Sequence, residues 1–147
     1  MIERILVATD FSLGADEAWR WAVDVARSLD ADLRLVHVAM PMSADVPRKA
    51  YQDYERTAAQ AQRMLQDRAA AAALPSGVKT MLSRGEPVQV LAEMARAENI
   101  DLVVVGTHRH HPAGEILVGS VAERLIRLAP CTVAVVKPSK TSVDAAR

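Results

Sequence analysis

The segment from Gly106 to Ser120 has the residue types of an anion-binding loop. It begins where the apolar run of residues 101–105 ends in a glycine, and it closes on Gly119 and Ser120 before a helical pattern. Backbone N–H groups at a helix start lack intrahelical acceptors, and the helix dipole makes that end positive. A strand, a loop and a helix start of this kind predict a cradle for phosphate or another anion.

The same loop carries three histidines, His108, His110 and His111. Histidines so close together can bind zinc, but the only nearby acid is Glu115 and no cysteine stands at a suitable spacing. We therefore expect a solvated polar loop and no metal site.

Two polar residues allow both a ligand-binding and a purely structural interpretation. Asp10 follows the first apolar run, where its carboxylate either contacts a ligand or accepts hydrogen bonds from nearby backbone N–H groups. Ser120, with Glu123 three residues later, has the pattern of a capping box, which needs no ligand. A cap and a phosphate contact are compatible at one helix start, so both interpretations stay open.

The elements that must position these residues alternate along the chain. Short apolar runs predict five strands, at residues 4–9, 33–39, 78–82, 101–105 and 132–136. Helical periodicity predicts four helices, one capped by Ser12, one from Tyr54 to Ala72, one opening at Pro87 and one from Val121 to Leu128. Strict alternation with short connections predicts a parallel sheet covered by helices on both faces.

Individual positions in these elements carry their own expectations. In the first helix, Trp21 falls with Ala18 and Ala22 on the predicted core face, and Trp19 falls at its edge. Residues 40–50 are predicted to form a loop. His37 lies within a strand and is expected to be packed or hydrogen-bonded.

Composition bounds the class of protein. The 147 residues carry no net charge and their lysines and arginines are scattered, which argues against a nucleic-acid-binding face. No run of about 18 apolar residues predicts a membrane span, and no secretory signal is visible. The single cysteine, Cys131, cannot form an internal disulfide, so we expect a cytoplasmic protein. Residues 1–138 are predicted to form one domain, followed by a polar tail at residues 139–147.

Familiar nucleotide-binding signatures are absent: the first strand is not followed by Gly-x-Gly-x-x-Gly, and no P-loop motif occurs. The spacing of Gly106 to Gly119-Ser120 instead matches Gly-x2-Gly-x9-Gly-Ser/Thr, the adenine-nucleotide motif of the universal stress protein family. The resemblance continues over nearly the whole chain, at residues 5–12, 35–38, 85–87, 120–125 and 129–136.

This resemblance implies a Rossmann-like fold, similar to the adenine nucleotide alpha hydrolases, with a five-stranded parallel sheet of order 3-2-1-4-5. It also implies a homodimer that pairs through the last strand, Thr132 to Val136. The order puts a topological switch point between the first and fourth strands. Asp10 and Gly106 would then face one crevice, where ligands of such sheets bind.

The resemblance further implies that ATP or another adenine nucleotide binds, with Mg²⁺ held by its phosphates as an open alternative. The implied contact residues are Ala8, Thr9, Asp10, Val38, Val105, Gly106, Arg109, Gly119, Ser120 and Val121. No nucleophile–base pair is visible, so we assign no catalytic residue and expect a regulatory protein with little or no hydrolysis. A nucleotide-free dimeric interaction module and a slow phosphate-handling hydrolase are the alternatives.

The chain departs from the motif at its second glycine, which is Arg109 here. Glycine lets a backbone approach phosphate closely, whereas arginine adds bulk but can hold phosphate with two hydrogen bonds. We expect Arg109 to act as a phosphate clamp, and the interaction-module alternative follows if it blocks the site. Ala8 replaces the proline that the family has before Thr-Asp, which is a milder change in the pocket wall.

Overall fold

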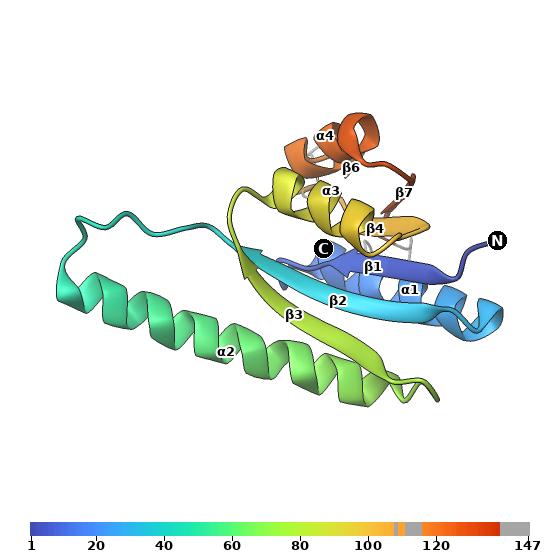
Figure 1. The fold of residues 1–147 in the computed structure, drawn as a ribbon, viewed down its shortest axis with the longest axis horizontal. Helices are drawn as coiled ribbons and strands as arrows, with labels where there is room; N and C mark the ends of the chain where they lie inside the picture. The colour runs from blue at the N-terminus through green and yellow to red at the C-terminus, as the bar shows by residue number, and fades with distance from the viewer. Residues whose placement is uncertain (108, 111–115, 139–147) are drawn as a thin grey trace.

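The computed structural model describes residues 1–107, 109–110 and 116–138 (Figure 1). Its main sheet has five strands, which are β1 (Arg4–Ala8), β2 (Asp32–Ala39), β3 (Val78–Arg84), β4 (Leu102–Gly106) and β7 (Thr132–Val136). Four helices connect them, namely α1 (Leu13–Leu29), α2 (Arg48–Ala72), α3 (Pro87–Ala97) and α4 (Ser120–Leu128). A short antiparallel pair, β5 (Arg109–His110) and β6 (Ile116–Leu117), was not predicted from the sequence.

The strands are parallel and lie in the order β3-β2-β1-β4-β7, which confirms the predicted topology. The central strand β1 pairs with β2 on one side, with Ile5 opposite Leu33, and with β4 on the other, with Ile5 opposite Leu102. The helices α1 and α2 cover one face of the sheet, and α3 and α4 cover the other (Figure 1).

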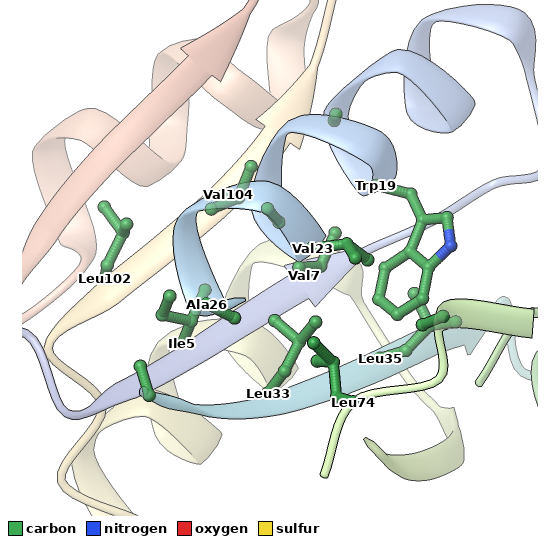
Figure 2. Packing of buried hydrophobic residues seen from close by; sticks show 14 of the residues in the cluster. Ile5, Val7, Trp19, Val23, Ala26, Leu33, Leu35, Leu74, Leu102 and Val104 are labelled. Carbon is green, nitrogen blue, oxygen red and sulfur yellow. The ribbon is translucent and has the colours of Figure 1, made fainter. Parts of the chain in front are cut away.

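Alternate residues of the central strand fill two separate cores. Ile5 and Val7 belong to the core under α1 and α2, while Leu6 belongs to the core under α3 and α4. Figure 2 shows Leu33 and Leu35 of β2 packed beside Ile5 and Val7. A strand buried on both faces needs apolar residues at successive positions, which explains the nearly continuous apolar runs of the sequence.

The prediction for the two tryptophans of α1 was wrong. Trp19 is 8% exposed and packs beside Leu35 (Figure 2), whereas Trp21 is 40% exposed. The inward face of α1 follows its buried alanines, among them Ala18 and Ala22. Residues two positions apart on a helix point about 200° away from each other, so only one of the two tryptophans can face the sheet.

Helix α2 begins at Arg48 and not near Tyr54, so the predicted loop of residues 40–50 is too long. The buried residues of α2 all lie further along, from Ala58 to Ala72. Its first turns extend past the sheet (Figure 1) and bury no apolar stripe, so they carry no periodic signal. Within the described ranges, no helix is long and apolar enough to cross a membrane.

Candidate ligand-binding site

A cavity of about 190 Å³ lies at the carboxyl edge of the sheet, between the ends of β1 and β4. Nine of the ten residues predicted to contact a nucleotide line it, and these are Ala8, Thr9, Asp10, Val38, Val105, Gly106, Gly119, Ser120 and Val121. The structure therefore brings together residues that lie more than a hundred positions apart in the chain.

Sequence reasoning missed several other lining residues, among them Ser12, His37, Pro87, Leu91 and Thr107. Two of the missed residues stand at helix starts, because α1 begins after Ser12 and α3 begins at Pro87. The predicted residue Ser120 stands at the start of a third helix, α4. The sequence signals for these helix starts were available, since Ser12 is the predicted cap and Pro87 is the predicted first residue of a helix. Three positive helix ends thus converge on one cavity.

Asp10 has the structural role that the sequence left open. Its Oδ1 accepts a hydrogen bond from the N–H of Ser12 at 2.9 Å, and the hydroxyl oxygen of Thr9 accepts one from the N–H of Phe11 at 3.0 Å. Ser12 caps α1, as predicted, because its Oγ accepts from the N–H of Ala15 at 3.2 Å. These bonds fold the β1–α1 turn tightly and keep the Asp10 carboxylate at the cavity.

His37 is hydrogen-bonded, as the sequence predicted. Its Nδ1 lies 2.7 Å from the carbonyl oxygen of Thr9. A carbonyl oxygen can only accept, so Nδ1 carries the proton in this contact.

Gly106 is required by the fold itself. A Cβ built on Gly106 would lie 2.3 Å from the carbonyl oxygen of Gly14, and a Cβ on Gly14 would lie 2.2 Å from that of Thr107. The first turn of α1 therefore packs backbone against backbone on the end of β4. Ala15 of α1 and Gly106 of β4, which take part in this contact, both line the cavity.

The capping-box prediction at α4 was wrong. Gly119 occupies the cap position with φ −68°, and Ser120 is the first helical residue. Among the described residues, no side chain caps this helix. Glu123 then stands one position too far along to complete the box, and it pairs with Arg127 at 3.4 Å. Ser120 is left to face the cavity, where the first N–H groups of α4 lack intrahelical acceptors.

An ion pair joins the two helices that start on the other side of the cavity. Glu86 caps α3 by accepting from the N–H of Gln89 at 2.9 Å, and its second oxygen lies 2.7 Å from Nη1 of Arg124 in α4. The hydrogen bond from Gln89, followed by the Arg124 contact, lowers the pKa of Glu86. The carboxylate thus stays ionised and bridges α3 and α4 at neutral pH.

The remaining predicted residue, Arg109, is described by its backbone alone. Its backbone pairs with Leu117 in the β5–β6 pair. His108 and residues 111–115 lie outside the described residues, as does the tail at 139–147. Among the residues that the structure does describe, no group of three or more histidines, cysteines or carboxylates could hold a metal ion.

The fold and the cavity together define a doubly wound α/β protein with a cavity at its switch point. The model of the universal stress protein family matches residues 1–137. The chain belongs to the universal stress protein family.

Individual relatives agree with this assignment. A protein of Staphylococcus haemolyticus named as a universal stress protein is 31% identical over 153 residues, covering 97% of this chain and 88% of that protein. The structure of the universal stress protein UspA from Lactobacillus plantarum is 28% identical with a TM-score of 0.78, over 91% of this chain and 97% of the other. A universal stress protein crystallised in complex with cAMP is 26% identical with a TM-score of 0.70, over 93% and 98% of the two chains.

Proposed function

We propose that this protein binds an adenine nucleotide, with ATP as the first candidate, in the cavity between β1 and β4. The observation that carries the proposal is the convergence of the α1, α3 and α4 N-termini on that cavity. N–H groups at helix starts bind phosphate, while apolar side chains such as Leu91 and Val38 offer a surface for the base. The cAMP complex of the 26% identical relative supports this choice of ligand class.

The size of the cavity indicates which parts of a nucleotide it can hold. Its volume of about 190 Å³ is below the roughly 300 Å³ at which ligand pockets begin. We propose that the base and ribose occupy its apolar side, and that the phosphates begin at the helix starts and extend past Ser120 toward Arg109, with Mg²⁺ bound by the phosphates where it is present.

We propose a regulatory role in the cytoplasm, with little or no hydrolysis. The titratable side chains of the described lining are Asp10 and His37. An oxygen of Asp10 accepts from the Ser12 backbone, and Nδ1 of His37 donates to the Thr9 backbone, so these contacts fix the two groups as structural partners. Steady-state turnover of ATP should lie far below the usual enzyme range of about 1–10³ s⁻¹. A rate within that range that Asp10→Asn abolishes would establish the hydrolase alternative.

Calorimetry with ATP and with adenosine tests the proposal and the role of Arg109 together. If Arg109 clamps phosphate, Arg109→Gly should weaken ATP binding by about tenfold or more and leave adenosine binding unchanged, because a charge-assisted contact contributes about 1.5–3 kcal/mol. Tighter ATP binding by Arg109→Gly would show that the arginine blocks the site.

The second candidate function is a nucleotide-free interaction module, which the replacement of a motif glycine by Arg109 favours. Mass spectrometry of natively purified protein separates the candidates. A co-purified adenine nucleotide supports the first, whereas no nucleotide there and no calorimetric binding by either variant would support the second.

A further inference from the structure

The turn between β1 and α1 contains a strained residue. Phe11 has φ +63°, in the left-handed region that bulky residues rarely adopt. The residues on either side of it, Asp10 and Ser12, both line the cavity. Strain of this kind persists only where surrounding contacts enforce it, and it concentrates at functional sites.

The Phe11 ring contacts side chains of two elements, β2 and α2, and a residue of α1 holds one of these side chains in turn. The centres of the Phe11 ring and of the His37 ring, in β2, lie 4.8 Å apart, and the two ring planes meet at 44°. The guanidinium carbon of Arg68, in α2, lies 4.9 Å from the centre of the Phe11 ring. Arg68 is held in turn by Asp16 of α1, with 3.0 Å between Nη2 and Oδ1, and both of these side chains are about three-quarters buried.

The side chains of Arg68, Phe11 and His37 form one stack. This stack also contacts the backbone of the turn. His37 donates from Nδ1 to the carbonyl oxygen of Thr9, the residue that opens the turn. The ring of Phe11 and the carbonyl of Thr9 are therefore fixed by one imidazole. Neither Phe11 nor Arg68 is among the residues that line the cavity.

We propose that Arg68, Phe11 and His37 act as positioning residues for the nucleotide site, by holding the β1–α1 turn in the conformation that places Asp10 and Ser12 at the cavity. This inference rests on the proposed nucleotide binding. In this proposal Arg68 acts through the Phe11 ring and the turn, without touching the ligand. The competing explanation is that the stack only fills space between α2 and the sheet.

Two substitutions of Phe11 separate the ring from the backbone strain. Glycine adopts positive φ without steric cost and alanine does not, yet both remove the ring. If the ring positions the turn, Phe11→Gly and Phe11→Ala should both weaken ATP binding, although Phe11→Gly relieves the strain. An unchanged ATP affinity in Phe11→Gly would overturn the proposal.

Arg68→Gln tests the outermost member of the stack against a matched control. Arg56→Gln makes the same change on the same helix, at an exposed arginine that lies 3.9 Å from Asp53. Arg68→Gln should weaken ATP binding by about three- to thirtyfold, the range of a partly buried cation–π contact, and Arg56→Gln should leave it unchanged. Equal effects of the two variants would refute a positioning role for Arg68.

Amide hydrogen exchange of the ligand-free protein gives a readout that simple packing would not produce. The N–H groups of Phe11 and Ser12 are bonded within the turn, to Thr9 Oγ1 and Asp10 Oδ1. Arg68→Gln should speed exchange at these two amides while that of the β4 amides, such as Val104, stays unchanged. A uniform increase across the turn and β4 would mean that the stack is ordinary packing.

The exchange experiment also distinguishes this inference from the proposed function. A wild-type protein without affinity for adenine nucleotides would defeat the proposed function, and with it the claim that the turn serves a nucleotide. The selective exchange effect at Phe11 and Ser12 would still report whether the stack holds the turn. Faster exchange there with unchanged ATP affinity would overturn the positioning role while leaving nucleotide binding intact.

Discussion

Replacing Gly106 by alanine should destabilise the ligand-free protein. The added Cβ would lie 2.3 Å from the carbonyl oxygen of Gly14, and the nearby N–H nitrogen of Ala15 would lie at 2.9 Å. Ordinary carbon–oxygen contacts begin at about 3.3 Å, so α1 must move by about 1 Å away from β4. Both groups belong to the backbone, so no side-chain rotation can relieve the contact.

The expected cost is about 1–3 kcal/mol, the range for overpacking a well-packed interior. A domain of this size loses about 2–4 °C in Tm for each kcal/mol, so the loss is measurable by thermal or urea unfolding. Gly14→Ala inserts its Cβ into the same interface, at 2.2 Å from the Thr107 oxygen. Alanine gains up to about 1 kcal/mol in helix propensity there, which offsets only part of the clash.

The double variant gives the sharpest assay. Gly14→Ala and Gly106→Ala push the same two segments apart, so the second change should cost clearly less once the first has displaced α1. Gly77→Ala serves as the control, because Gly77 has φ +74° but no heavy atom within 4 Å of a built Cβ. Its cost should come from backbone strain alone and add to that of Gly106→Ala.

Unchanged stability of ligand-free Gly106→Ala would refute this reasoning. It would mean that Gly106 is needed only to let a ligand approach the backbone closely, and not for the packing of α1 on β4. Additivity of the Gly14 and Gly106 changes within about 0.5 kcal/mol would refute the shared contact.

Three further outcomes follow from contacts elsewhere in the fold. Arg34 is buried and paired with Glu98, so Glu98→Gln, which leaves the guanidinium without its counter-ion, should lower the unfolding free energy more than Arg34→Met does. Hydrogen bonds from the N–H groups of Glu3 and Arg4 hold the pKa of the Asp101 carboxyl below its ordinary value. The stability that these bonds confer is present at neutral pH and is lost as the pH falls through the folded-state pKa. Asp101→Asn should therefore make Tm fall less steeply with decreasing pH on the acid side of a Tm–pH curve. Proline at Ala134 removes a backbone donor from β7, so if two copies pair through this edge strand, Ala134→Pro should shift sedimentation at tens of micromolar from dimer to monomer.

Each of these has a result that would contradict it. If Arg34→Met lowered the free energy of unfolding more than Glu98→Gln does, the hydrogen bonds and packing of the Arg34 side chain, and not the balance of charge, would matter at that site. An acid limb unchanged by Asp101→Asn would place the acid sensitivity at other carboxylates. A wild-type monomer at tens of micromolar would remove the proposed homodimer.

The order of elements and most of the cavity lining could be predicted because they depend on local signals. Apolar runs mark strands buried on both faces, and the carboxyl ends of adjacent parallel strands lie together whatever the side chains between them. Asp10, Gly106 and Ser120 therefore meet at one cavity, as the sequence predicted.

What escaped prediction depends on partners distant in the chain. Trp19 is buried beside Leu35 of β2, and helical periodicity within α1 cannot indicate this contact. The first turns of α2 contain no fully buried residue, so this part of the helix leaves no apolar pattern in the sequence. The contact of Gly106 with Gly14 and the stack of Arg68 on Phe11 join separate segments, so neither glycine nor arginine shows its role in the sequence.

The central position of β1 has a consequence for how the chain is completed during synthesis. Its neighbour β2 follows within the first forty residues, but its other neighbour, β4, begins only at Leu102. Until β4 emerges from the ribosome, β1 is an apolar edge strand that is paired with β2 on one side only. Gly14 then has no strand end to pack against. The half built from β1, α1, β2, α2 and β3 thus leaves one side of an apolar strand open, which favours aggregation of the incomplete chain. The strand that covers this side, β4, also provides part of the cavity lining.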